Sequence, residues 1–207
     1  MRVLAFMNQK GGVGKTTTTV NLGAALAQAG KNVCMIDMDP QAHLTINYGL
    51  DPNSEQASLY DVLVNETPLL ESIHSVGERL AVIPSHIDLA AAEVELVSTL
   101  GRELILRKRI ESASHDFDYI LLDCPPSLGL LTINALAVAD DVMIPMQPHF
   151  LALQGMAKLL ETVQLVAKRM NPKLGVGGNY SDHVRFTSQV VARGDFRITG
   201  VHRAIPR

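Results

Sequence analysis

Short apolar runs alternate with longer stretches of helical character along most of the chain. The apolar runs predict strands at residues 2–8, 32–39, 79–85, 118–124 and 141–147. Helical spacing or Ala/Leu richness predicts helices at 15–29, 88–97, 100–113, 129–139 and 153–170. Because the strands are apolar without strict alternation, we expect them to be covered on both faces. The pattern therefore predicts an α/β fold: a doubly wound, mostly parallel sheet with helices on both faces.

The regular alternation ends in the last part of the chain. After Pro172 one more strand is predicted at 174–178, and residues 179–207 then lack sustained apolar periodicity, with short strand candidates at 186–191 and 197–201. Scattered arginines make this segment basic: Arg185, Arg193, Arg197, Arg203 and Arg207. We therefore divide the chain into a domain of residues 1–178 and an atypical basic tail of residues 179–207, for which truncation, a frameshift, disorder and contact with phosphates all stay open.

Composition narrows the classes of protein. The 207 residues, 47% hydrophobic and 19% charged, suit one globular domain, and no apolar run reaches the length of a membrane span. The amino terminus has no export signal, so the cytoplasm is the expected compartment. A net charge of -3 with a pI near 6.1 gives no global attraction to DNA or anionic lipid. Cys34 and Cys124 are too few for a disulfide framework or a metal quartet and are expected to be buried and reduced.

The strongest chemical signal is KGGVGKTT at residues 10–17, between the first predicted strand and the first predicted helix. Its glycines let backbone N–H groups turn inward around phosphate oxygens, and the helix presents its positive amino end. Lys15 is expected to reach the β and γ phosphates, Thr16 to complete the coordination of Mg²⁺, and Thr17 to donate to the α phosphate. The expected nucleotide-binding residues are Gly11, Gly12, Val13, Gly14, Lys15, Thr16 and Thr17.

Three carboxylates lie at the carboxyl ends of predicted strands. Asp37 and Asp39 stand in MIDMDPQ, and Asp123 ends the hydrophobic run of YILLDCPPS, a Walker B pattern. Because the carboxyl ends of parallel strands carry the site in such sheets, these groups are expected to face the same crevice as residues 10–17. Asp123 is expected to hold Mg²⁺ directly or through water, while an acid after the second strand can orient water or support the metal shell. The expected metal site comprises Thr16, Asp37 and Asp123.

The segment after Asp123 has its own character. Pro125, Pro126 and Gly129 predict a stiff, sharply turning stretch. Such a stretch next to a metal carboxylate is suited to a switch loop.

Four segments, KGGVGKTT, DMDPQ, LLDCPPS and IPMQPHFLALQGM, in this order and spacing, resemble the ParA/Soj branch of the deviant Walker A ATPases, which are SIMIBI-class P-loop NTPases. The resemblance covers residues 1–178. It implies a P-loop NTPase fold, ATP or ADP with Mg²⁺ as cofactors, slow ATP hydrolysis and an ATP-dependent homodimer with a ParB-like activator. The implied role is in chromosome or plasmid partition, away from membranes and on the nucleoid where DNA binding is retained.

The resemblance also assigns roles to single residues. Gln9 replaces the first glycine of the usual GxxxxGK[ST] pattern, and a second lysine, Lys10, is present. Lys10 is implied to cross a nucleotide-sandwiched dimer to the partner's phosphates, Asp39 to position the attacking water, and Gln41 to support the switch region. The implied catalytic residues are Lys10, Lys15 and Asp39.

The tail is where the chain departs from the family. Residues 179–207 do not resemble the strand and helices that complete the adenine pocket and supply basic residues for nonspecific DNA binding. Two alternatives to a working partition ATPase therefore stay open. One is a truncated, non-hydrolysing relative that binds only nucleotide or a partner. The other is a MinD-like positioning ATPase, which would need a membrane-binding amphipathic helix at the carboxyl end.

Overall fold

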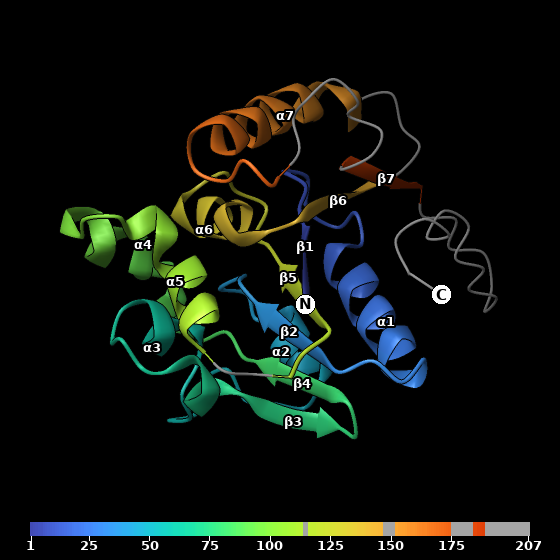
Figure 1. Ribbon diagram of the computed structural model, residues 1–207, viewed down its shortest axis with the longest axis vertical. Coiled ribbons are helices and arrows are strands. Elements are labelled where there is room, and N and C mark those ends of the chain that lie inside the picture. The colour runs from blue at the N-terminus through green and yellow to red at the C-terminus, as the bar shows by residue number, and fades with distance from the viewer. Residues whose placement is uncertain (114–115, 147–151, 175–183, 189–207) are drawn as a thin grey trace.

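A computed structural model describes residues 1–113, 116–146, 152–174 and 184–188. Within these residues the centre is a seven-stranded sheet in the order β3-β4-β2-β5-β1-β6-β7 (Figure 1). Neighbouring strands pair in parallel, except that β3 runs antiparallel to β4. The strands are β1 (Arg2–Phe6), β2 (Val33–Asp37), β3 (His74–Gly77), β4 (Leu80–Ile83), β5 (Tyr119–Asp123), β6 (Asp141–Met146) and β7 (Val184–Ser188).

Helices cover both faces of this sheet, which confirms the predicted doubly wound α/β fold. The α-helices are α1 (Lys15–Gln28), α2 (His43–Asn47), α3 (Leu59–Leu63), α4 (Ala92–Glu95), α5 (Ile105–Ser112), α6 (Leu130–Val138) and α7 (Ala152–Arg169). The 3-10 helices are η1 (Leu69–Ser72), η2 (Ile87–Ala90), η3 (Leu96–Ser98) and η4 (Arg102–Leu104). Helices α1 and α2 pack on one face, whereas α3, α5, α6 and α7 form the layer on the other.

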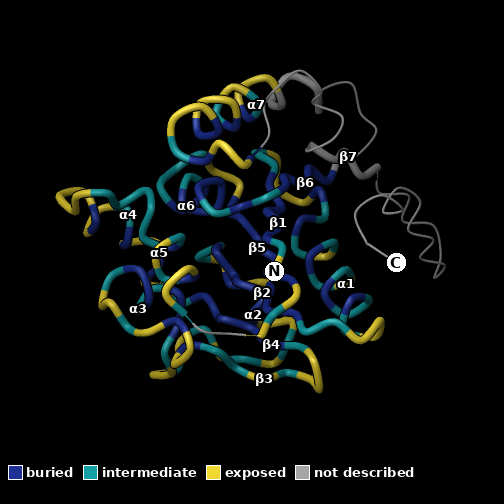
Figure 2. Tube along the Cα trace, viewed as in Figure 1, coloured by how far each residue is buried: buried dark blue, intermediate teal, exposed yellow. Residues whose placement is uncertain are grey.

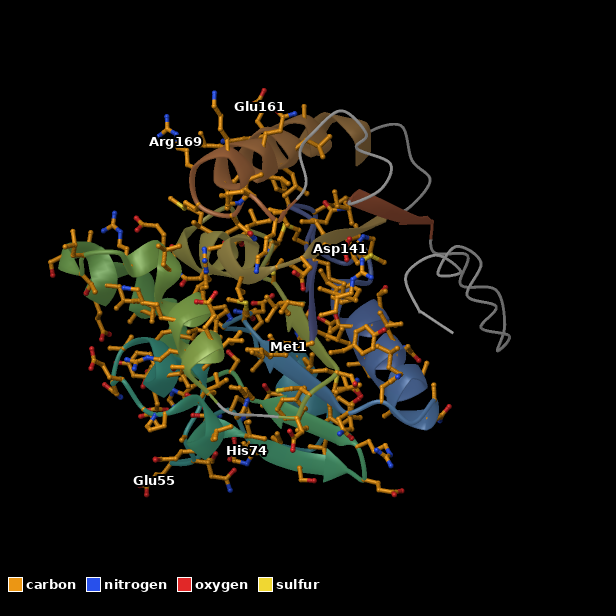
Figure 3. All side chains as sticks on the ribbon, in the orientation of Figure 1. Met1, Glu55, His74, Asp141, Glu161 and Arg169 are labelled. Carbon is orange, nitrogen blue, oxygen red and sulfur yellow. The ribbon has the colours of Figure 1, made fainter. Side chains whose placement is uncertain are left out.

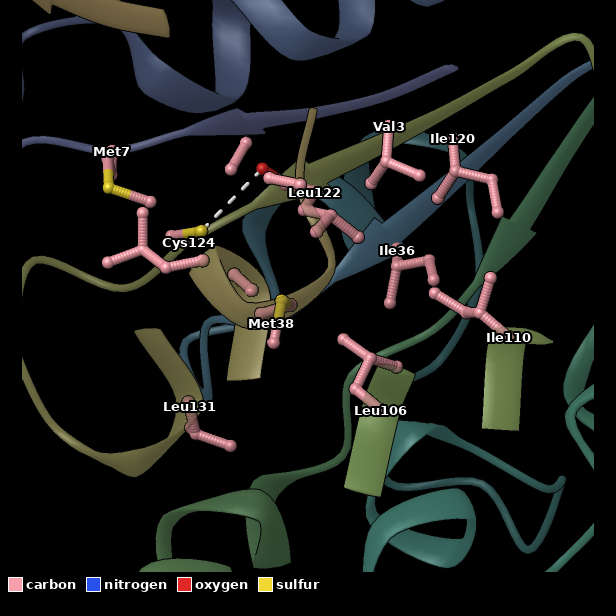
Figure 4. Close-up of a cluster of buried hydrophobic side chains, with 14 of the residues drawn as sticks. Val3, Met7, Ile36, Met38, Leu106, Ile110, Ile120, Leu122, Cys124 and Leu131 are labelled. Atoms are coloured by element: carbon pink, nitrogen blue, oxygen red, sulfur yellow. Dashed lines mark hydrogen bonds between the residues drawn. The ribbon is translucent and has the colours of Figure 1, made fainter. Parts of the chain in front are cut away.

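The central strands β1, β2 and β5 are apolar along most of their length because successive side chains enter two different cores. In β1, Val3 and Ala5 belong to the cluster under α3–α7, and Leu4 and Phe6 belong to the cluster under α1. The central strands are accordingly buried along their length (Figure 2). The larger cluster includes Met38, Cys124 and Leu131 at the end of the sheet where the strands finish (Figure 4).

Helix α7 packs by one face within residues 157–169. Leu159, Val163 and Val166 are buried against the larger core at helical spacing, and Leu160 is partly buried against it. Glu161 and Arg169 point away from the molecule on the outer side of the helix (Figure 3). Among the described helices, none is both long and apolar enough to cross a bilayer.

Most predicted elements within the described residues lie where the pattern placed them, but two predicted helices are divided. Residues 100–113, expected as one helix, form η4 and α5. Residues 88–97, expected as one helix, form η2, the single α-turn of α4, and η3. Two contacts constrain this stretch. Just before it, the backbone N–H of Ser85 donates to Thr45 Oγ1, and within it, Glu93 accepts a hydrogen bond from α6. The chain bends between these anchors because it follows neighbouring elements rather than its own helical spacing.

The carboxyl-terminal segment is described only in part, whereas the end of α1 and both cysteines lie within the described residues. The strand predicted at 174–178 lies outside the described residues except for Leu174, and so does most of the tail; β7 falls inside residues 179–207 and pairs in parallel with β6. Gly30 follows α1 with φ +81°, a left-handed conformation that ends the helix. Cys34 and Cys124 are buried free thiols, as expected, and burial raises the pKa of Cys34 to about 12.

Candidate phosphate and metal site

The site is assembled where β1, β5 and β2 end side by side. Phe6 is in register with Asp123, and Asp123 is in register with Asp37. The backbone continues this alignment past the strands, since the N–H of Cys124 donates to the Phe6 carbonyl and that of Met38 to the Asp123 carbonyl. Parallel pairing therefore places two carboxylates that are far apart in sequence on neighbouring strands beside the glycine-rich loop.

The loop of residues 7–14 is held to β6 at its beginning. Met7 donates its N–H to the Met143 carbonyl at 3.0 Å, and the Asn8 amide donates to the Pro145 carbonyl at 2.9 Å. The Asn8 side chain also accepts a bond from the N–H of Lys10 at 3.0 Å. Gly12 and Gly14 have φ of +69° and +89°, which a residue with a side chain rarely adopts. These contacts and torsions shape a turn that delivers the chain to the start of α1.

The amino end of α1 is open to an anion. Gly14 is its N-cap and supplies no capping side chain, and the first turn contains no acidic residue. The hydroxyls of Thr18 and Thr19 donate back to the carbonyls of Gly14 and Lys15, so they do not cap the first turn either. Uncapped N–H groups together with the positive end of the helix dipole are the physical basis of phosphate binding.

The two lysines of the motif occupy different environments. Lys15 is 8% exposed and close enough to Asp123 for its charge to lower the pKa of that carboxyl, whereas Lys10 is exposed on the loop. Because buried charges are costly unless they are paired, the ammonium of Lys15 beside the carboxylate of Asp123 suits the binding of a charged ligand. Because Lys10 is exposed on the same loop, its side chain is suited to contact another molecule.

Asp123 is the most perturbed acid of the site. It is 1% exposed, and burial followed by repulsion from Asp37 raises its pKa to about 7, against the opposing effects of a hydrogen bond from Thr16 and of Lys15. Its Oδ1 lies 3.4 Å from the hydroxyl of Thr19, and its Oδ2 is buried with no hydrogen-bond partner. An orphaned buried carboxylate oxygen beside a threonine hydroxyl fits a divalent cation, whose remaining ligands are phosphate and water.

Asp37 is buried as deeply, but both of its oxygens are engaged. Oδ2 accepts from the backbone N–H and the hydroxyl of Thr45 at 2.8 and 2.7 Å, and Oδ1 accepts from the N–H of Asp39 at 3.2 Å. Burial raises its pKa to about 6 although these bonds lower it. Ala42, the N-cap of α2, has no side chain that can cap the helix. Asp37, at the end of β2, therefore caps α2 by accepting the N–H of Thr45.

Asp39 sits on the turn that follows β2. It is half-buried; its Oδ1 accepts from the N–H of Gln41 at 3.0 Å, and its carbonyl accepts from the N–H of Ala42 at 2.8 Å. Ala42 has φ +54°, unusual for a non-glycine residue, so the turn is tightly constrained. Gln41 and Thr17 are exposed at the same edge of the sheet.

Several contributors had no signal in the motifs. Thr19 and Thr45 support Asp123 and Asp37 from α1 and α2, and Glu93 reaches the start of α6 behind the loop that follows Asp123. A threonine repeat and an Ala/Glu-rich stretch are common in helices, so only the tertiary contacts single these residues out. No cluster of three or more His, Cys, Asp or Glu side chains able to hold a metal occurs in the described part of the chain.

Comparison with known proteins agrees with this arrangement. A family model described as an AAA domain matches residues 1–176. The chain is 48% identical to the sporulation initiation inhibitor protein Soj of Bacillus subtilis over 178 residues, which are 86% of this chain and 70% of Soj. It is 41% identical to the chromosome partitioning protein ParA of Myxococcus xanthus, with 100% of this chain and 75% of that protein covered.

A solved structure shares the fold closely. It is that of cobyrinic acid a,c-diamide synthase from Mycobacterium smegmatis with bound ADP and magnesium. This structure matches with a TM-score of 0.80 and 42% identity over 84% of this chain and 71% of that chain. The chain therefore belongs to the AAA-domain family of P-loop NTPases that includes Soj and ParA.

Proposed function

We propose that this chain is a Mg-ATP-dependent dimerising ATPase switch that acts in chromosome or plasmid partition. The observation that carries the proposal is the partnerless Asp123 oxygen beside Thr16 and Lys15, at the uncapped amino end of α1. The likeness to Soj and ParA supplies the biological setting. Residues 1–178 are proposed to form the ATPase domain, with residues 179–207 as an atypical basic tail from which β7 joins the edge of the sheet.

ATP and ADP are proposed to bind through the loop and the first turn of α1. The backbone N–H groups of Gly11, Gly12, Val13 and Gly14 surround the phosphates, Lys15 contacts the β and γ phosphates, and Thr17 donates to the α phosphate. Thr16 and Asp123 hold Mg²⁺, with Asp37 behind them in the same strand register. Mg²⁺ supplies charge neutralisation on the β and γ phosphates when bound.

Hydrolysis is proposed to be slow, because the described residues of the site include no strong base. Asp39, half-buried on a constrained turn, orients the attacking water. Lys15 offsets the charge that develops on the transferred phosphoryl group, and Lys10 does so from the other subunit of an ATP-bound homodimer. The burial of Lys15 supports its role within its own subunit, and the exposure of Lys10 supports its role across the dimer interface.

The partners follow from the same switch. An ATP-bound homodimer is proposed to engage a ParB-like activator in the cytoplasm, and to associate with the nucleoid if the arginines of residues 179–207 bind DNA phosphates. A non-hydrolysing nucleotide binder and a MinD-like membrane-directed switch are the competing readings. They differ in turnover and in whether DNA or anionic vesicles bind the ATP-loaded form.

The test combines three measurements on the full 207-residue chain. A fluorescent ATP analogue reports binding with and without Mg²⁺, light scattering after size exclusion reports mass with ATP or ADP, and phosphate release reports turnover with and without DNA. Mg²⁺-dependent binding, an ATP-dependent dimer and DNA-stimulated turnover support the proposal. Binding without turnover favours the non-hydrolysing relative, and binding of ATP-loaded protein to anionic vesicles rather than DNA favours the MinD-like reading.

Lys10 gives the sharpest variant test of the dimer. Lys10→Ala is expected to keep nucleotide binding and lose ATP-dependent dimerisation, because its charge is used across the interface. Lys31→Ala, which removes a charge just past α1, is the matched control and is expected to dimerise normally. A fully dimeric Lys10→Ala protein would contradict the proposed interface.

A further inference from the structure

The amino end of α6 is closed by a side chain from a distant element. Its N-cap is Gly129, which has no side chain to offer. Instead Oε1 of Glu93, on α4, accepts a hydrogen bond from the N–H of Leu131 at 3.3 Å, across 38 positions in the sequence. A carboxylate at a helix amino end is stabilised both by the bond and by the helix dipole.

Gly129 is shaped to admit this carboxylate. A Cβ added at Gly129 would lie 2.1 Å from Oε1 of Glu93 and 2.8 Å from both Cδ and Oε2, and these are its three nearest heavy atoms. Its φ of -81° is open to any residue, so backbone conformation does not require glycine here. The absence of a side chain therefore serves the approach of Glu93.

Glu93 also faces the loops that carry the acids of the site. Together with Leu89, Ala90 and Leu131 it lines an open hollow of about 220 Å³. Pro40, next to Asp39, lines the same hollow, and so do Pro125 and Ser127, shortly after Asp123. In Figure 1, α4 lies at one side of the sheet, and the Glu93 bond joins it to α6. The residues of the hollow thus span both loops.

The same stretch is tied to the site at its other end. The N–H of Ser85 donates to Thr45 Oγ1 at 2.9 Å, and Thr45 in turn donates to Asp37. Residues 85–93 therefore form a brace from the Asp37 network to the amino end of α6. At the far end of this brace, the Glu93 carboxylate meets the segment that leads out of Asp123.

We propose that Glu93 is a positioning residue of the ATP site: it holds residues 125–129 in the arrangement in which the neighbouring Asp123 and Asp39 support turnover. The inference rests on the proposed ATPase function. Glu93 acts through the loop and touches neither nucleotide nor metal, so it affects the rate of the chemical step and leaves nucleotide affinity intact.

The test measures turnover and nucleotide affinity separately for a set of variants. Glu93→Ala is expected to lower kcat about 10-fold or more while the Kd for the fluorescent ATP analogue stays within about twofold, because misplacement of a catalytic group costs rate before binding. Glu93→Gln keeps an acceptor oxygen for Leu131 and is expected to recover most of the rate. Glu95→Ala is the matched control, since Glu95 lies on the same turn but bonds the exposed hydroxyl of Tyr60.

Gly129→Ala reaches the same contact from the other side. It displaces the carboxylate and is expected to lower kcat as Glu93→Ala does, whereas the double variant is expected to be no slower than Glu93→Ala alone, because the added methyl then meets an empty space. Multiplicative losses in the double variant, a parallel loss of affinity and rate, or a Glu93→Ala rate within about twofold of wild type would each overturn the inference. Failure of the wild-type protein to hydrolyse ATP would instead overturn the proposed function, and is recorded before any variant is compared.

Discussion

Asp123→Asn is expected to stabilise the nucleotide-free protein while it destroys the metal site. A pKa of about 7 for Asp123, against about 3.9 for an exposed aspartate, corresponds to about 4 kcal/mol of folding free energy lost when the carboxyl ionises. The asparagine amide is itself buried, which costs about 1–3 kcal/mol where it lacks a partner. The net expectation is a gain of about 1–3 kcal/mol in the free energy of unfolding at pH 8.5.

The pH dependence gives this prediction its sign. Below about pH 4 the carboxyl is protonated in both the folded and the unfolded chain, and the charge penalty vanishes. Between about pH 4 and about pH 7 the folded chain binds more protons than the unfolded chain, so wild-type stability falls as pH rises. The advantage of Asp123→Asn should therefore be larger at pH 8.5 than at pH 5.5.

Urea unfolding of both proteins without nucleotide, at the two pH values, measures the difference. A repeat with Mg-ATP is expected to remove or reverse the difference, since a ligand present at 100 times its Kd stabilises the wild type by about 2.7 kcal/mol and the variant has lost the metal carboxylate. A variant that is less stable than wild type at pH 8.5, or an advantage that does not change with pH, would refute the role assigned to burial and to the Asp37 charge.

Three further predictions use the same site. Lys15→Ala is expected to weaken nucleotide binding about 100-fold, because a buried charge-assisted contact of about 3 kcal/mol is lost; titration with the fluorescent ATP analogue, with Lys31→Ala as control, checks it. Asp39→Ala is expected to keep nucleotide affinity, lose hydrolysis and accumulate as the ATP-bound dimer in size exclusion with light scattering; hydrolysis at the parental rate would remove Asp39 from its proposed role. Thr45→Val is expected to lower the free energy of unfolding by about 2–3 kcal/mol, because Asp37 loses a donor and the buried N–H of Ser85 loses its acceptor. Urea unfolding measures the last effect, with Thr162→Val, whose hydroxyl bonds only within α7, expected to change it by less than about 1 kcal/mol.

The architecture was largely predictable because hydrophobic periodicity and glycine placement act locally. The positions of five strands along the chain, the ends of α1 and the burial of the sheet on both faces follow from residues that are neighbours in sequence. The short helices α2 and α3 and the antiparallel strand β3 carry too little periodicity to be recognised. Residues 88–97 have helical spacing, yet packing and hydrogen bonds to other elements override it.

The candidate site divides in the same way. The sequence by itself determined which groups could bind a phosphate and a cation, because residues 10–17 follow a recognisable strand, and Asp37, Asp39 and Asp123 lie at the carboxyl ends of two others. The tertiary structure alone decided that Asp37 is bonded to Thr45 while Asp123 keeps an oxygen without a partner, and that Glu93 closes α6. These distinctions depend on the register of parallel strands and on contacts between distant segments, which the spacing of residues along one chain does not encode.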